Sequence, residues 1–190
     1  MNRPALDHEV IVAETVHWLE QAVIGLNLCP FAKSVHVKKQ IRYVVSEAET
    51  PEQLLEQLMQ ELELLAQTNP DKIDTTLLIH PKVLADFEDY NEFLDVADAA
   101  LEDMDLDGIL QVASFHPEYQ FADTDKNDID NYTNRTPYPT LHLLREDSID
   151  RAVEAFPEAS DIFEKNMETM RALGHDGWDK LMQAPAQEKS

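Results

Sequence analysis

TTLLIHP, at residues 75–81, and GILQVASFHP, at residues 108–117, are the clearest strands of this sequence. Each is a short, mainly apolar run that ends in His-Pro, and proline cannot continue the hydrogen-bonded ladder of a strand. The first run is apolar at nearly every position, which is typical of a strand covered on both faces. The two stretches therefore predict the centre of a sheet that has helices packed against it.

Helices and strands alternate along the rest of the chain. Hydrophobic periodicity predicts strands at 41–48 and 139–146, and helices at 9–26, 50–65, 82–103, 148–156 and 158–173. This order favours an α/β or α+β domain on a four-stranded, at least partly parallel sheet covered by helices. The helix at 82–103 is long enough to connect two parallel strands.

Capping signals support several of these helices. Asp7 is placed to cap the first helix, and Thr50 begins the second, with Gln53 three residues later as in a capping box. Asp147 or Ser148 is the expected cap of the helix that ends near residue 156. Gly174 is the expected end of the helix at 158–173, and residues 175–183 are expected to add a last turn.

The length of 190 residues suits one compact domain. We expect a single globular domain over residues 1–184 and a flexible C-terminal tail at 185–190. The longest apolar runs are far shorter than the ~18 residues of a membrane span, and the N-terminus lacks an apolar signal core. These features predict a soluble cytoplasmic protein.

The charge is strongly negative, because 38 acidic residues oppose 15 basic ones and the net charge is −23. Such a chain repels phosphate backbones and anionic lipid, so we expect neither a nucleic-acid partner nor a membrane partner. Residues 21–44 are the exception, because they hold Lys33, Lys38, Lys39 and Arg42 and no acid. Lys33 and Arg42 are therefore candidate binding residues for a small anionic molecule.

Three histidines are candidates for chemistry because they lie at or near strand ends. If the strands before His80 and His116 are parallel, the two imidazoles come close together at one edge of the sheet. Imidazole is suited to proton transfer and to metal ligation. The alternative is that both rings only hydrogen-bond the backbone. His142 alternates with Thr140 and Leu144 and is either a core histidine or a supporting member of a site.

Cys29 is the only cysteine, so an internal disulfide and a cysteine-based zinc cluster are both excluded. If Pro30 starts a short helix, Cys29 is its N-cap, and the helix N-terminus together with Lys33 favours a reactive thiolate. The alternative is a small buried apolar residue between Leu28 and Phe31.

The polar loop at 118–138 is the longest segment without a predicted helix or strand, and loops of that length are often functional. Arg135 presents a guanidinium fork that suits a carboxylate or phosphate, and Asn134 lies beside it. Tyr132 and Tyr138 are placed to wall a planar ligand. The sequence therefore assigns these four residues to substrate binding.

A divalent metal is the one cofactor that the sequence suggests. The acidic run in the polar loop fails the EF-hand pattern, because Asp128 stands where the loop needs glycine and Asn134 where it needs glutamate. Oxygen and imidazole ligands suit several metals, so Asp128 or Asp130 with His80 and His116 remains an alternative metal site.

Several runs resemble one known family. These are GLNLCPFA at 25–32, TTLLIHP at 75–81, DFEDYNEFLD at 86–95, LQVASFHPEYQF at 110–121 and NYTNRTPYPTLHLLRE at 131–146. Together they resemble an uncharacterised bacterial family, the domain-of-unknown-function family 1415, over nearly the whole chain. The resemblance implies a stand-alone, single-domain cytosolic protein and assigns no catalytic role to any residue.

Three functions are compatible with these patterns. The first is a cytosolic enzyme acting on a small anionic metabolite, with Cys29, His116 and His142 as catalytic residues in a pocket under the polar loop. The second is a metal-dependent hydrolase that uses His80 with His116 and His142. The third is a non-enzymatic protein that docks a basic protein partner through the acidic helix at 82–103 and the tyrosine-rich polar loop.

Overall fold

The computed structural model describes residues 5–183. The two ends of the predicted domain and the predicted tail at 185–190 lie outside the described residues. Four strands of the described chain form one sheet: β1 (Ile41–Val45), β2 (Thr75–Ile79), β3 (Leu110–Phe115) and β4 (Thr140–Arg145). All four predicted strands are confirmed, although β1 ends at Val45 instead of residue 48.

The sheet has the order β1-β2-β4-β3, and β4 is the strand that reverses direction. β1 and β2 are parallel, whereas β4 is antiparallel to both β2 and β3. β2 and β3 therefore run in the same direction on either side of β4. The predicted mixed α/β architecture with a partly parallel sheet is confirmed, and His80 and His116 follow their strands at the same edge of the sheet.

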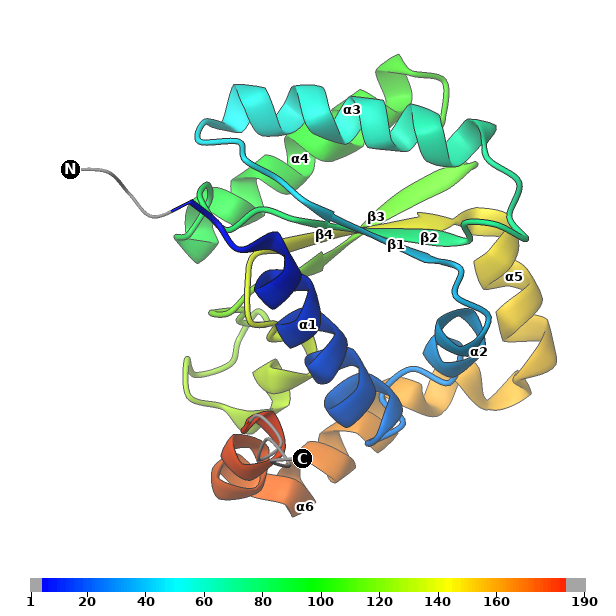
Figure 1. Ribbon diagram of the computed structural model, residues 1–190. Coiled ribbons are helices and arrows are strands. Elements are labelled where there is room, and N and C mark those ends of the chain that lie inside the picture. The colour runs from blue at the N-terminus through cyan, green and yellow to red at the C-terminus, as the bar shows by residue number, and fades with distance from the viewer. Residues whose placement is uncertain (1–4, 184–190) are drawn as a thin grey trace, which may run out of the picture.

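Helices cover both faces of the sheet (Figure 1). One face, which we call the α3/α4 face, is covered by α3 (Pro51–Gln67) and α4 (Phe87–Asp103). The opposite α1/α6 face carries the N-terminal and C-terminal helices: α1 (His8–Trp18), η1 (Leu19–Ile24), α2 (Ala32–Val37), α5 (Glu146–Ala155), η3 (Pro157–Asp161) and α6 (Ile162–Met182). A short 3-10 helix, η2 (Ile129–Asn134), lies within the polar loop.

Alternation along the strands separates two hydrophobic cores, because successive side chains point to opposite faces of a sheet. Leu78, Leu141 and Leu143 face α3 and α4, where they pack against fully buried leucines of α3: Leu54, Leu58, Leu62 and Leu65. On the α1/α6 face, Trp18 of α1 and Trp178 of α6 belong to a second cluster that Ile41, Tyr43 and Phe115 of the sheet join. Packing is less complete on the α1/α6 face, where a cavity lies between the sheet and the helices that cover it.

The predicted caps of the first two long helices are confirmed. Asp7 accepts a hydrogen bond from the Val10 amide at 3.2 Å, and Thr50 accepts one from the Gln53 amide at 3.3 Å. Gly174 interrupts its helix as expected, because it adopts a positive φ of 69° that is not helical. After this kink a second helical segment, which shares the label α6, continues to Met182 and is longer than the expected last turn.

Two predicted helix starts are wrong, and the helix predicted from residue 158 begins as the 3-10 turn η3 and becomes α-helical only at Ile162. α4 begins at Phe87, where Asp86 is the cap, instead of at residue 82, because residues 81–86 form a connection held by histidines. α5 begins at Glu146 immediately after β4, so that neither Asp147 nor Ser148 is its cap.

The buried face of α4 is partly aromatic. Tyr90 and Phe93 are buried together with Ala97 and Leu101, whereas Asn91 is exposed. The acidic side chains on the outer face of α4 are exposed as expected: Glu88, Asp89, Glu92, Asp95, Asp98 and Glu102.

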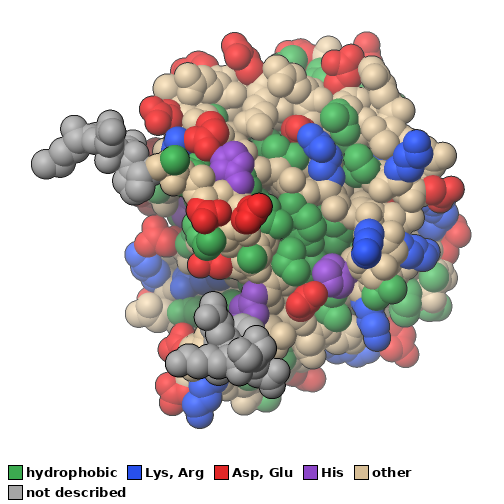
Figure 2. Space-filling view, in the orientation of Figure 1, with side chains coloured by type: hydrophobic (Ala, Val, Ile, Leu, Met, Phe, Trp, Pro, Cys, Tyr) green, Lys and Arg blue, Asp and Glu red, His purple; other side chains and the backbone are tan. Residues whose placement is uncertain are grey.

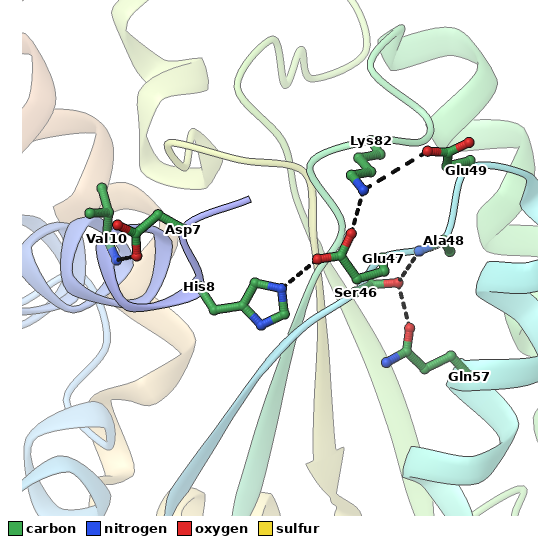
Figure 3. Close-up of polar contacts among 9 residues, drawn as sticks. All are labelled: Asp7, His8, Val10, Ser46, Glu47, Ala48, Glu49, Gln57 and Lys82. Carbon is green, nitrogen blue, oxygen red and sulfur yellow. Dashed lines mark hydrogen bonds and ion pairs between the residues drawn. The ribbon is translucent and has the colours of Figure 1, made fainter. Parts of the chain in front are cut away.

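A surface network connects the start of α1 to two loops at the edge of the sheet (Figure 3). His8 of α1 lies 2.6 Å from Glu47, which also pairs with Lys82 after β2. Glu47 follows the buried Ser46, whose hydroxyl bonds to Gln57 of α3. Lys82 also pairs with Glu49 at 3.9 Å, and all four members of the ion-pair network are partly exposed, so we assign the network to positioning α1 and not to chemistry.

Within residues 5–183, none of the helices combines the length and the apolar character that crossing a membrane requires.

Candidate functional site

The main candidate site is a cavity of about 380 Å³ between the α1/α6 face of the sheet and the helices that cover it, which we call the sheet cavity. Its apolar lining includes Trp18, Leu28, Phe31, Leu77, Phe115 and Ile149. Its polar lining is Cys29, Asp74, Thr75, Gln111, Thr133, Asn134, His142, Ser148 and Asn166. Figure 2 shows a continuous hydrophobic area on the surface between α1, β1 and α2, on this side of the molecule.

His142 is the central polar group of the sheet cavity. It points to the α1/α6 face because it alternates with the buried Leu141 and Leu143 of β4. The Thr75 hydroxyl donates to the Leu143 carbonyl at 2.6 Å, so the contact of 2.7 Å between Thr75 Oγ1 and His142 Nε2 requires a proton on Nε2. His142 Nδ1 is then an acceptor, and it has no hydrogen-bond partner among residues 5–183.

Burial keeps the His142 imidazole uncharged. Desolvation lowers the pKa of His142 to about 4, because the surrounding apolar side chains stabilise the neutral ring over the cation. At neutral pH the cavity therefore contains a neutral imidazole with a free lone pair. Such a group accepts a hydrogen bond from a hydroxyl or an N–H group of a ligand.

Cys29 lines the same cavity, but its surroundings disfavour a thiolate. Burial raises the pKa of Cys29, and this effect outweighs hydrogen bonds from the backbone amides of Phe31 and Ala32. The expectation that Cys29 caps the short helix is wrong, because α2 starts at Ala32 and Phe31 occupies the cap position. Lys33 is exposed on α2 and does not line the cavity.

One wall of the cavity is a π-helix. The predicted first helix is α-helical only to Trp18 and continues as η1, which supplies Leu19 and Val23 to the cavity. A Cβ atom on Gly25, directly after η1, would lie 2.3 Å from the Gln21 carbonyl oxygen, so only glycine fits this close turn. Because π-helical turns occur frequently at functional sites, this wall is independent support for the sheet cavity as the site.

His80 and His116 lie on the other face of the sheet and hold the connection to α4. His80 Nδ1 donates to the Val83 carbonyl at 2.9 Å, and burial lowers the pKa of His80 to about 4. His116 Nε2 donates to the Leu84 carbonyl at 3.0 Å, while its Nδ1 accepts from the Glu118 amide at 3.0 Å. Both nitrogens of His116 are occupied, so this geometry favours the backbone-bonding alternative over general acid–base catalysis.

Tyr90 of α4 lies against both of these histidines. Its ring centroid is 5.8 Å from that of His80 and 4.9 Å from that of His116. Its hydroxyl donates to the Thr140 carbonyl at 2.7 Å and accepts from the Phe115 amide at 3.0 Å. The sequence pattern does not single out Tyr90, although its buried position follows once the true start of α4 is known.

The alternative metal site is not assembled. The described part of the chain contains no group of three or more histidine, cysteine, aspartate or glutamate side chains placed to hold a metal ion. His142 lies on the opposite face from His80 and His116, Asp128 caps η2, and Asp130 forms a bidentate ion pair with Arg171 at 2.7 and 3.1 Å.

Arg135 lines a second cavity of about 940 Å³ between α1, the polar loop and the end of α6. Its Nε donates to the Tyr119 carbonyl at 3.1 Å and one Nη2 proton to the Lys126 carbonyl at 2.6 Å. The guanidinium carbon lies 4.3 Å from the centre of the Tyr132 ring. The structure therefore separates Arg135 and Tyr132 from Cys29 and His142, which line the sheet cavity.

The other predicted binding residues also lie in different parts of the structure. Asn134 lines the sheet cavity, where its amide nitrogen donates to the Ser114 carbonyl at 3.1 Å. Tyr138 bonds to Glu14 of α1. Arg42 turns toward the α3/α4 face and forms a bidentate ion pair with the buried Glu61 at 2.9 and 3.1 Å, so it is not part of either cavity.

A family profile for proteins of unknown function, DUF1415, matches residues 10–180. The chain belongs to this family. No curated protein and no solved structure matches the chain. Membership in DUF1415 confirms the family resemblance of the sequence and leaves the function to be inferred from the two cavities.

Proposed function

We propose that this member of DUF1415 is a cytosolic protein that binds a small, uncharged and mainly apolar molecule in the sheet cavity. The single observation that carries the proposal is the pairing of an apolar cavity with the free Nδ1 of a neutral His142. A volume of about 380 Å³ lies within the range of ligand pockets. Apolar walls with few oriented polar groups are the usual composition of such pockets.

The charge of the lining supports an uncharged ligand. The described residues around the sheet cavity include no lysine and no arginine, and Asp74 is their one acidic side chain. An anion would therefore lose its hydration without gaining a cationic partner. This argues against the anionic metabolite of the first hypothesis as the occupant of this cavity.

The position of the polar groups supports a ligand with one donor. The ring of His142 is fixed by Thr75, so its lone pair has a defined direction. Trp18 and Phe115 lie edge to face with their centroids 5.3 Å apart and offer aromatic surface to a planar molecule. A compact bicyclic ring with an N–H or O–H group matches both features.

Indole and benzofuran test this proposal, because they have similar shapes and only indole carries an N–H donor. We expect isothermal titration calorimetry to detect both ligands and to give indole the lower Kd, by about tenfold, from its hydrogen bond to His142. His142→Leu should remove most of the preference for indole. The absence of binding by either compound at millimolar concentration would contradict the proposal.

A cavity-filling variant tests the location. Ala113 of β3 lines the cavity, so Ala113→Leu should abolish binding of both compounds. Ala99→Leu is the matched control, because it adds the same atoms on the exposed side of α4. Equal binding by both variants would place the ligand elsewhere.

A further inference from the structure

We propose that the second cavity is a separate site for a zwitterion of the α-amino acid class. In this site the ligand carboxylate contacts Arg135 and its ammonium group contacts Glu14. Both side chains line the cavity, which the polar loop, α1 and the C-terminal part of α6 enclose. The two charges lie far apart in the sequence, yet the fold brings them to one cavity.

Arg135 offers unused donors in a fixed orientation. Two of its N–H groups bond to backbone carbonyls, and the ring of Tyr132 lies beneath its guanidinium. A guanidinium has five N–H donors, so three remain for a ligand. Arg135 forms no ion pair with an acidic side chain among residues 5–183. A rigid, unpaired guanidinium with free donors is suited to bind a carboxylate through two hydrogen bonds.

Glu14 offers the complementary charge. Tyr138 donates to its Oε2, and Oε1 has no hydrogen-bond partner in the described chain. Glu14 also forms no ion pair with a described basic residue. A carboxylate held by a neighbouring hydroxyl, with one oxygen free, is suited to accept a hydrogen bond from an ammonium group.

The remaining lining selects a zwitterion with an apolar side chain. The rest of the lining is mainly apolar, with Val10, Ala13, Pro117, Pro137, Trp178 and Met182, and it also includes the polar side chains of His17 and Thr136. A ligand without net charge also avoids repulsion by a protein whose net charge is −23. A simple carboxylic acid would meet the Arg135 charge but would be repelled by Glu14. The combination therefore favours an apolar or aromatic amino acid over an anionic metabolite.

Three related probes separate the contributions of the two charges. We expect L-phenylalanine to bind at least about tenfold more tightly than 3-phenylpropanoate, which lacks the ammonium group, and than phenethylamine, which lacks the carboxylate. Titration calorimetry or ligand-observed NMR gives each Kd. Similar Kd values for all three probes, or no binding of L-phenylalanine, would overturn the proposal.

Variants test the two residues. Glu14→Gln keeps an acceptor for Tyr138 but loses the charge, so it should remove the preference for L-phenylalanine over 3-phenylpropanoate. Glu9→Gln is the matched control on the exposed part of α1 and should change nothing. Arg135→Lys should weaken L-phenylalanine and 3-phenylpropanoate alike, with circular dichroism confirming an intact fold. An unchanged preference in Glu14→Gln would overturn the assignment of Glu14.

The two cavities are tested independently. Ala113→Leu fills the sheet cavity and should leave the binding of L-phenylalanine unchanged, because Ala113 does not line the second cavity. Loss of L-phenylalanine binding in this variant would show that both ligands use the sheet cavity and would refute a separate site. The test of the second cavity with L-phenylalanine is therefore independent of whether indole binds in the sheet cavity.

Discussion

Replacing Tyr90 by phenylalanine should destabilise the protein strongly although it removes a single oxygen atom. The hydroxyl donates to the Thr140 carbonyl at 2.7 Å and accepts from the Phe115 amide at 3.0 Å, and Tyr90 is fully buried. Tyr90→Phe leaves the aromatic ring in place and deprives one buried carbonyl and one amide of their partner. Unpartnered buried groups cost about 1–3 kcal/mol each, so we expect a loss of about 3 kcal/mol.

Urea unfolding and differential scanning calorimetry measure this loss. For a domain of this size, about 3 kcal/mol corresponds to a decrease in Tm of about 6–12 °C. Tyr119→Phe is the matched control, because Tyr119 is half-buried and its hydroxyl makes no hydrogen bond with the described residues. A cost below about 1 kcal/mol for Tyr90→Phe, or an equal cost for Tyr119→Phe, would refute the assignment of the two bonds to this hydroxyl.

Three further predictions follow from buried polar groups. His80 and His142 have pKa values of about 4 in the fold, below their ordinary value of 6.5, so the unfolded chain binds more protons between these limits. The free energy of unfolding should therefore fall as the pH decreases from about 6.5 to 4, by up to about 1.4 kcal/mol per pH unit for each ring. In urea titrations the free energy of unfolding of His142→Gln should decrease less than that of the wild type over this pH range. An equal decrease in the two proteins would contradict the assignment of this pH dependence to His142. Arg42→Ala leaves the buried Glu61 without its partner and should cost about 1–2 kcal/mol in the same assay, whereas Arg42→Lys should cost less. Cys29, whose pKa is raised by burial, should react with iodoacetamide more slowly than free glutathione at pH 7.5, as measured by mass spectrometry; a faster reaction would indicate a thiolate.

Most of the sheet could be predicted from the sequence because its signals are local. Strand residues such as those at 75–79 and 110–115 are apolar over short runs, and Thr50 forms the predicted cap in its own turn of chain. The start of α4 was harder to predict, because residues 81–86 depend on hydrogen bonds from His80 and His116 that come from outside the segment.

The candidate site was only partly predictable, because its residues meet through strand order. His142 and Cys29 were identified as candidates by their residue type, and both line the sheet cavity. The partner of His142, Thr75, could not be found without knowing that β2 lies beside β4. Glu14 was missed because nothing near it in the sequence indicates that α1 borders the polar loop.

The position of β4 has a consequence for how the chain reaches its native state. Among residues 5–183, β4 is the last strand along the chain, yet it occupies an interior place and supplies the pairing partner of β3. Until residues 140–145 arrive, β3 has no neighbour in the sheet and β2 has one unpaired edge. Native pairing thus requires contacts between distant parts of the chain, which slows folding and exposes unpaired edges to association with other molecules. The sheet therefore cannot be completed while only the first three strands have left the ribosome. The whole domain assembles only after its fourth strand has emerged.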